Sequence, residues 1–178
     1  MHKDVESILI SQEKLENIVK SLAKQIEKDY NGKEFIMVGL LKGSIVFMAE
    51  LMTKINLDFD IDFMVASSYG GGTESSGKVK ILKDLGIDPK DKYILIVEDI
   101  VDSGNTLNFV INHLMTRGAA DVKVCTLCDK PSRRKVPLTP DYCGAEIPDE
   151  FIVGYGLDYD EKYRNLPYIG ILKRSVYS

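Results

Sequence analysis

The feature that most constrains this chain is an apolar run, YILIV at residues 93–97, that continues directly into the polar sequence EDIVDSGNTL. A short run of aliphatic and β-branched residues is typical of a strand that is buried on both faces. The polar residues lead into a helix, whose apolar face is marked by Leu107, Val110, Ile111 and Leu114. A buried strand, a tight polar turn and a helix form half of a strand–helix–strand unit, which predicts an α/β fold.

The same alternation of strands and helices recurs along the chain. An amphipathic helix is predicted between Ser11, which can cap its start, and Asn31-Gly32, which ends it. A second helix is predicted over residues 45–55, and Gly118 ends the helix after the polar turn. Further strands are predicted over residues 35–41, 57–65, 78–82 and 122–128. No repeat or linker divides the sequence, which predicts one domain over residues 1–178 with a mainly parallel sheet.

Two segments of this outline have unusual compositions. In LDFDIDFMV, apolar residues at 59, 61, 63 and 65 alternate with aspartates at 58, 60 and 62. This period of two predicts a strand whose apolar side chains are buried and whose aspartates face solvent, without forming a metal cluster. The sequence GGGTESSG at residues 70–77 lacks apolar groups, which predicts a loop that stays mobile until a ligand binds it.

Composition and charge exclude several classes of protein. The 27 acidic residues exceed the 23 basic ones and give a net charge of −4, whereas proteins that bind nucleic acid usually carry a basic excess. No apolar run approaches the roughly 20 residues that cross a bilayer. The N-terminus also lacks a signal-peptide pattern, so we expect a cytoplasmic protein that binds neither membrane nor nucleic acid.

Cysteine and histidine are too scarce to carry the chemistry. The three cysteines are an odd number, unlike a disulfide scaffold, and Cys125 and Cys128 are predicted to be buried on opposite faces of a strand. Only two histidines are present, and His113 is predicted to face solvent. Catalysis must therefore use carboxylates, lysines, arginines, backbone amides or a metal ion.

The polar turn after residues 93–97 has the chemistry of a phosphate site. Ligands of open α/β sheets bind beyond the carboxyl ends of the strands. Here the small residues Ser103, Gly104, Asn105 and Thr106 open a helix, so that free backbone N–H groups and the positive end of the helix dipole face outward. The chain contains neither GxxxxGK[ST] nor GxGxxG, which argues against a P-loop kinase or a dinucleotide-binding enzyme.

Three acidic residues adjoin this turn and would repel a bare phosphate. Glu98 and Asp99 become useful if the ligand also presents sugar hydroxyls, or brings Mg²⁺ with its water shell. Asp102 could act as a general base toward a bound ligand. The alternative interpretation is structural, because an aspartate near the start of a helix is a common stabilising arrangement.

The sequence VEDIVDSGNTL resembles the signature of the type I phosphoribosyltransferases. Four further stretches resemble the hypoxanthine-guanine branch of that family and follow in the family's order: GLLKGS, SSYGGGTESSG, DKPSRR and IPDEFIVGYGLDYDEKYRNLPYIG. The resemblance spans nearly the whole chain. It implies a mainly parallel twisted sheet flanked by helices, and a small hood subdomain formed by the N-terminal residues and roughly residues 145–178. It also implies a flexible lid at roughly residues 67–78.

The resemblance also implies an activity, purine salvage. In this family ribose 5-phosphate passes from phosphoribosyl pyrophosphate to hypoxanthine or guanine with Mg²⁺ present, giving IMP or GMP and pyrophosphate. By resemblance, residues 103–106 hold the 5-phosphate, Glu98 and Asp99 bind the ribose hydroxyls and the hydrated Mg²⁺, and Asp102 is the general base. Relatives of this kind also imply a homodimer or homotetramer.

Further roles follow from the other matching stretches. Lys130 would bond the purine 6-oxygen and so disfavour adenine, whose 6-amino group is a donor. The remaining assignments are Phe151 (stacking on the purine), Ile152 (reading its edge through the backbone), Asp158 (beside the purine, binding a second Mg²⁺), Lys42, Gly43 and Arg164 (pyrophosphate), and Ser68 and Tyr69 (the lid). The Leu41–Lys42 peptide is often cis in this family.

Some alternatives stay open at this point. An RNA-binding regulator of pyrimidine operons shares the fold, but the acidic balance and the matching purine segment argue against it. A xanthine-preferring enzyme is compatible with Lys130, because xanthine also carries a 6-oxygen. For Arg133 and Arg134, a pyrophosphate contact and a surface or subunit contact are both compatible with the sequence.

Overall fold

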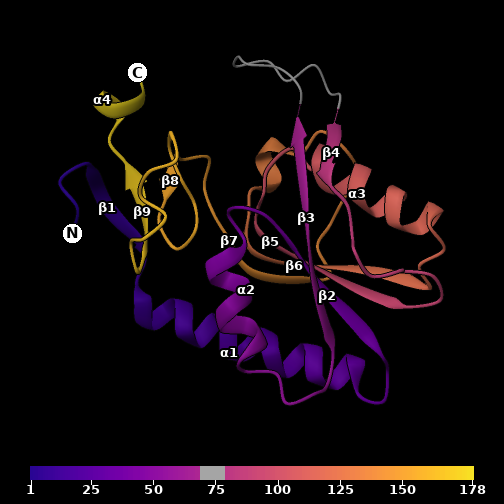
Figure 1. Ribbon diagram of the computed structural model, residues 1–178. Coiled ribbons are helices and arrows are strands. Elements are labelled where there is room, and N and C mark those ends of the chain that lie inside the picture. Colours follow the sequence, from indigo (N-terminus) through magenta and orange to yellow (C-terminus); the bar gives the residue numbers. More distant parts are fainter. Residues whose placement is uncertain (69–78) are drawn as a thin grey trace.

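The computed structural model describes residues 1–68 and 79–178, and its largest element is a six-stranded sheet (Figure 1). The strands lie in the order β4-β3-β2-β5-β6-β7, and all run parallel except β4, which is antiparallel to β3. Their bounds are β2 (Phe35–Leu40), β3 (Asp60–Ser68), β4 (Val79–Lys83), β5 (Tyr93–Val101), β6 (Asp121–Asp129) and β7 (Tyr142–Glu146). The predicted α/β fold with a mainly parallel sheet is confirmed.

Helices cover both faces of this sheet. Helices α1 (Gln12–Tyr30) and α2 (Ile45–Met52) pack on one face, and α3 (Asn105–Thr116) packs on the other (Figure 1). Alternate residues of β2 therefore enter different cores, with Phe35 on the α1 side and Ile36 on the α3 side. As predicted, Ser11 caps α1, accepting a hydrogen bond from the Lys14 amide at 3.3 Å.

A second, smaller sheet joins the two ends of the chain. Its antiparallel order is β1-β9-β8, formed by β1 (Val5–Ile10), β9 (Ile169–Leu172) and β8 (Ile152–Val153). A short 3-10 turn, η1 (Pro131–Arg133), follows β6, and helix α4 (Arg174–Tyr177) follows β9. The small sheet lies beside the main one, with α4 at its outer end (Figure 1). In the described parts of the chain, no helix has the length and apolar character needed to cross a bilayer.

The predicted burial of β3 is wrong at two positions. Ile61 is 41% exposed, whereas the side chain of Asp62 is only 13% exposed. Asp62 accepts hydrogen bonds from the amides of Gly86 and Ile87 at 2.8 and 3.0 Å, and it pairs with Lys83. The loop after β4 thus covers the face of β3 that we expected to be solvated.

The prediction for His113 is also wrong. Its side chain is half-buried, with Nε2 2.7 Å from Asp84 Oδ2, and Arg117 donates to the other oxygen of the same carboxylate at 2.8 Å. This ion-pair cluster ties α3 to the end of β4, which sequence periodicity within α3 does not reveal. Cys125 and Cys128, in contrast, are fully buried as predicted, although both belong to the same core cluster and not to the cores on opposite faces of the sheet.

Candidate active site

Three neighbouring parallel strands end at the same edge of the sheet. A tight turn at residues 41–43 follows β2, the polar turn follows β5, and Lys130 follows β6. The last two connections are bonded together, since Lys130 N donates to Val101 O and Lys135 N donates to Ser103 O, each at 2.9 Å. The topology therefore brings three of the predicted sequence stretches to one place.

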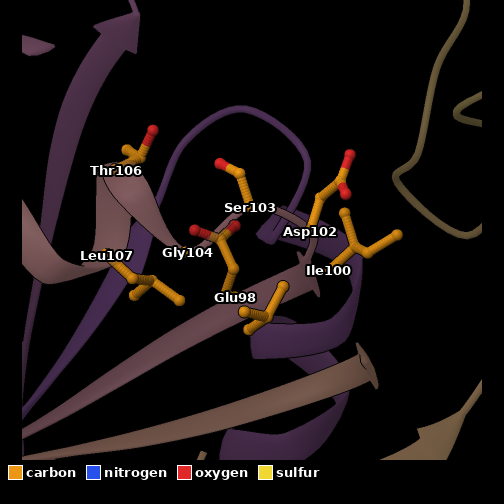
Figure 2. Close-up of a pocket in the computed structure, with 8 residues that line it drawn as sticks. Glu98, Ile100, Asp102, Ser103, Gly104, Thr106 and Leu107 are labelled. Carbon is orange, nitrogen blue, oxygen red and sulfur yellow. The ribbon is translucent and has the colours of Figure 1, made fainter. Parts of the chain in front are cut away.

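The polar turn encloses a cavity of about 170 Å³ (Figure 2). Strand β5 continues to Val101, further than predicted, and α3 begins at Asn105. Gly104 makes the turn between them with φ of 80°, a conformation that glycine adopts without a steric cost. Glu98 rises from β5 beneath the turn, and the Ser103 and Thr106 hydroxyls project from the turn and from the first turn of α3 (Figure 2).

The start of α3 leaves backbone donors for a ligand. The first hydrogen bond within the helix runs from Asn108 N to Gly104 O. Of the earlier amides, that of Asn105 donates to Ser103 Oγ at 3.3 Å. Donors at a helix N-terminus, together with the helix dipole, favour an anion of the size of a phosphate.

A second cavity, of about 220 Å³, lies beside the first, and Glu98 and Thr106 line both. Six residues assigned to pyrophosphate or metal line this second cavity: Lys42, Gly43, Glu98, Asp99, Asp158 and Arg164. The Leu41–Lys42 peptide is cis, as the resemblance implies. A side chain at position 43 would overlap the Asp99 carboxylate, so only glycine lets this turn pack against β5.

The acidic pair at the end of β5 is poorly hydrated. Burial raises the pKa of Glu98 well above its usual range, and the negative charge of Asp99 raises it further. Burial also raises the pKa of Asp99, although hydrogen bonds from Glu98 and from the Ile100 amide oppose the shift. A cation or a set of sugar hydroxyls would therefore be a favourable partner for this pair.

The donor set suits Mg²⁺ supplied with a substrate. Among residues 1–68 and 79–178, no three His, Cys, Asp or Glu side chains form a ready-made metal site. Mg²⁺ commonly binds through one or two carboxylates while phosphates and water complete its shell. Glu98, Asp99 and Asp158 offer carboxylate oxygens of that kind around one cavity.

The two cations of the second cavity are paired with a carboxylate that the sequence analysis missed. Glu161 lies 3.1 Å from Lys42 Nζ and 3.2 Å from Arg164 Nη2, and Arg164 also pairs with Asp158 at 3.0 Å. Glu161 sits in a two-residue turn with Asp160, where φ values of 62° and 50° and the Tyr159–Lys162 bridge indicate a tight hairpin. Neither residue is the Asn or Gly that normally signals such a turn.

The carboxylate of Asp102 forms an ion pair with Arg133. Arg133 Nε lies 3.0 Å from Asp102 Oδ1, and its Nη1 lies 3.2 Å from Asp149 Oδ1. The Arg133 contact is an ion pair that is not aligned as a hydrogen bond, and Oδ1 of Asp102 has no aligned donor among the described residues. The carboxylate oxygen is thus covered but still able to accept a proton.

Arg134 has a different position from its neighbour. Its side chain is 13% exposed, pairs with Asp129, and donates to Asp102 O at 2.5 Å and to Leu138 O at 2.9 Å. This position differs from both alternatives that the sequence left open, because Arg134 braces the polar turn from within the molecule. It joins the end of β6 to the end of β5.

The residues assigned to the purine lie next to this brace. Lys130 is only 7% exposed, and its Nζ donates to Glu150 O at 2.6 Å. Burial lowers the pKa of Lys130, while the charges of Asp102 and Asp149 oppose the shift. Phe151 follows Glu150 and is 37% exposed, and Ile152 is buried at the start of β8. Ser68 ends β3, whereas Tyr69 and residues 70–78 of the expected lid lie outside the described residues.

Comparison with known proteins identifies the class of protein to which this fold and this polar turn belong. Residues 6–160 match the sequence model of the phosphoribosyl transferase domain. The chain is also 51% identical over 178 residues to a Staphylococcus aureus hypoxanthine-guanine phosphoribosyltransferase, covering 100% of this chain and 99% of that protein.

Solved structures agree with the sequence comparison. A Staphylococcus aureus hypoxanthine phosphoribosyltransferase superposes with a TM-score of 0.96 at 51% identity, covering 100% of this chain and 97% of the other. A Bacillus anthracis hypoxanthine-guanine phosphoribosyltransferase gives a TM-score of 0.91 at 52% identity, with 95% and 99% covered. The chain belongs to the phosphoribosyltransferase family, in its hypoxanthine-guanine branch.

Proposed function

We propose that this enzyme transfers ribose 5-phosphate from phosphoribosyl pyrophosphate to hypoxanthine and guanine, as a purine salvage enzyme of the cytoplasm. The main support for this proposal is that the ends of β2, β5 and β6 lie at the same edge of the sheet. The turn after β2 offers cations, the turn after β5 offers a phosphate cradle with a carboxylate, and the residue after β6 is a buried lysine. A donor with a phosphate at one end and a pyrophosphate at the other, and an acceptor with a carbonyl oxygen, need these three parts.

The donor would lie along the two adjoining cavities. Residues 103–106 would hold the 5-phosphate through backbone amides and hydroxyls, supported by the dipole of α3. Lys42 and Arg164 would hold the pyrophosphate at the other end, where negative charge grows as the bond to the ribose breaks. Binding both ends orients the ribose carbon toward the end of β6.

Mg²⁺ would neutralise part of the pyrophosphate charge when it is bound with the donor. Glu98, Asp99 and Asp158 are the residues of this chain that would hold it, directly or through water. Glu98 and Asp99 would also accept hydrogen bonds from the ribose hydroxyls. Gly43 keeps the turn after β2 close enough for this geometry, because its lack of a side chain leaves room for Asp99.

The purine would lie between the end of β6 and Phe151. Lys130 would exchange its hydrogen bond to Glu150 O for one to the purine 6-oxygen. Asp102 would accept the proton that leaves the purine ring nitrogen as the new bond forms. Adenine presents a donor at position 6, so it would leave the buried lysine without an acceptor.

The small sheet would act as a hood over this site, and residues 67–78 as a lid that excludes water. We further propose a homodimer or homotetramer, which sedimentation of the purified protein would measure. The hood assignment is supported by Asp158 and Arg164, which follow β8 and line the pyrophosphate cavity. Exclusion of water matters because a positively charged ribose carbon would otherwise be hydrolysed.

A panel of bases tests the proposal directly. Hypoxanthine, guanine, xanthine, adenine, uracil and orotate are each incubated with phosphoribosyl pyrophosphate, with Mg²⁺ or with excess EDTA, and pyrophosphate release is followed. We expect release with hypoxanthine and guanine only, and only with Mg²⁺. Faster pyrophosphate release with xanthine would mean that xanthine is the preferred acceptor. No pyrophosphate release with any base would contradict the proposed activity.

A further inference from the structure

Two tyrosine rings, those of Tyr177 and Tyr159, contact the ring of Phe151. The ring centroid of Tyr177 lies 4.8 Å from that of Phe151, with the ring planes 26° apart, which is a stacked arrangement. Tyr159 contacts Phe151 edge-on, at 5.4 Å and 88°, and lies 6.4 Å from Tyr177. Such geometries are favourable beyond the apolar area that they bury.

The backbone fixes this cluster at the outer side of the small sheet. Leu172 N, at the end of β9, donates to Phe151 O at 2.8 Å, and α4 begins two residues later. Lys173 anchors the start of α4, since its amide donates to Asp4 O at 3.0 Å and its Nζ to Lys3 O at 2.6 Å. In Figure 1, α4 lies beyond β8 and β9, away from the main sheet.

Phe151 therefore has one ring face covered and one available. Tyr177 takes one face and Tyr159 takes an edge, yet 37% of Phe151 remains exposed. The residue before Phe151 holds Lys130, the other residue assigned to the purine, through its carbonyl oxygen.

We propose that Tyr177 is a positioning residue for the purine, acting through Phe151. Its ring backs Phe151 and holds that ring in one orientation, so that a purine adds to the open face as the third member of a stack. This inference rests on the proposed function, which places the base on Phe151. Phe151 lies in a loop before a two-residue strand, and without Tyr177 its side chain would lose freedom only when the purine binds.

Steady-state kinetics of Tyr177→Ala test this role. The variant loses the Tyr177–Phe151 stack, and Phe151 must then become ordered when the purine binds. We therefore expect the KM for hypoxanthine to rise about three- to tenfold. The kcat and the KM for phosphoribosyl pyrophosphate should stay within about twofold, since Tyr177 touches neither the donor cavities nor Asp102. Tyr177→Phe keeps the ring and should restore the parent KM for hypoxanthine.

Tyr168→Ala is the matched control. Tyr168 also belongs to the small core beneath the small sheet, but its hydroxyl bonds the His2 amide and its ring does not stack on Phe151. An equal rise in the KM for hypoxanthine in Tyr168→Ala would mean that any loss of hood packing has this effect, which would overturn the inference. An unchanged or lower KM in Tyr177→Ala would also overturn it while leaving the proposed function intact, whereas a parent protein inactive toward every base would overturn both.

Discussion

Asp102 lies between two arginines that act on different parts of it. Arg134 holds its backbone carbonyl and fixes the polar turn, whereas Arg133 pairs with its carboxylate from the exposed side. Arg133 also shares its guanidinium with Asp149. Arg134 thus holds the backbone of Asp102 in place, while the side chain of Asp102 as a whole is 46% exposed.

Replacing Asp102 should slow the transfer step while leaving the binding of phosphoribosyl pyrophosphate nearly unchanged. Asp102→Ala is expected to lower kcat about 10²- to 10⁴-fold, the usual contribution of a general base, because the leaving proton of the purine loses its acceptor. The KM for phosphoribosyl pyrophosphate should change little, since the backbone amides of the turn remain. Asp149→Asn serves as the control, because it removes only the outer partner of Arg133. An equal loss of kcat in both variants would point to Arg133 instead.

Glu161 pairs with the two cations that we propose for pyrophosphate binding. Its carboxylate pairs with Lys42 and Arg164, and the hydrogen bonds from these two side chains, together with their charges, lower the pKa of Glu161. Glu161→Gln should therefore strengthen inhibition by pyrophosphate about two- to fivefold, within the modest range expected of an exposed ion pair. Product-inhibition kinetics measure this change. Weaker inhibition would mean that Glu161 helps to bind the product instead of competing with it.

At the scale of elements, Asp62 holds β3 to the loop that follows β4. Burial alone would raise the pKa of this carboxyl, but hydrogen bonds from the Ile87, Phe63 and Gly86 amides and from Lys83 outweigh it and lower the pKa. A native pKa below the unfolded value of about 3.9 stabilises the fold above that pH. The stabilisation is lost as the pH falls through the native pKa.

Asp62→Asn should lower the free energy of unfolding at pH 7 by about 1–3 kcal/mol, because two loop amides and a lysine lose a charged acceptor. The difference from the parent should shrink below about pH 4, where the carboxyl of the unfolded parent chain takes up a proton before that of the native protein does. Urea unfolding at several pH values measures both effects. Asp60→Asn, at an exposed position on the same strand, should stay within about 0.5 kcal/mol, and a loss there equal to that at Asp62 would contradict the account.

Comparing the predicted elements with the observed ones shows what sequence patterns can predict. Strand β2 is recognisable because every residue from Phe35 to Leu40 is buried, and the turn at Gly104 is marked by small polar residues. Strand β1 was not identified, because it pairs only with β9 and the residues between Val5 and Ile10 are mostly exposed. Strand β7 is a short edge strand, which carries a similarly weak pattern.

Contacts between distant segments explain the remaining differences. The partners of Asp62 lie in a loop beyond β4, and the partner of His113 lies at the end of β4. A local period of two or of 3.6 residues carries no information on such partners. Glu161 and Tyr177 were missed for the same reason, since each acts through a residue that only the fold brings near.

At the scale of the whole molecule, the site depends on the main sheet and on the segment that contains and follows β8. The main sheet supplies the polar turn, the acidic pair Glu98 and Asp99, and Lys130. The segment that contains and follows β8 supplies Phe151, Asp158 and Arg164. Gly156 permits the close approach of these two parts, because a side chain there would overlap the Gly43 carbonyl. The second cavity therefore forms only when the segment after β8 packs against the turn after β2.

Calorimetric titration of phosphoribosyl pyrophosphate in the presence of Mg²⁺ tests the central claim, that the turn between β5 and α3 grips a sugar phosphate. The parent protein should bind the donor, and Thr106→Val, which removes a hydroxyl lining both cavities at nearly constant volume, should weaken binding about three- to thirtyfold. Thr116→Val, at the far end of the same helix, should bind as the parent does. Absence of binding by the parent, or equal binding by the parent and Thr106→Val, would contradict the account.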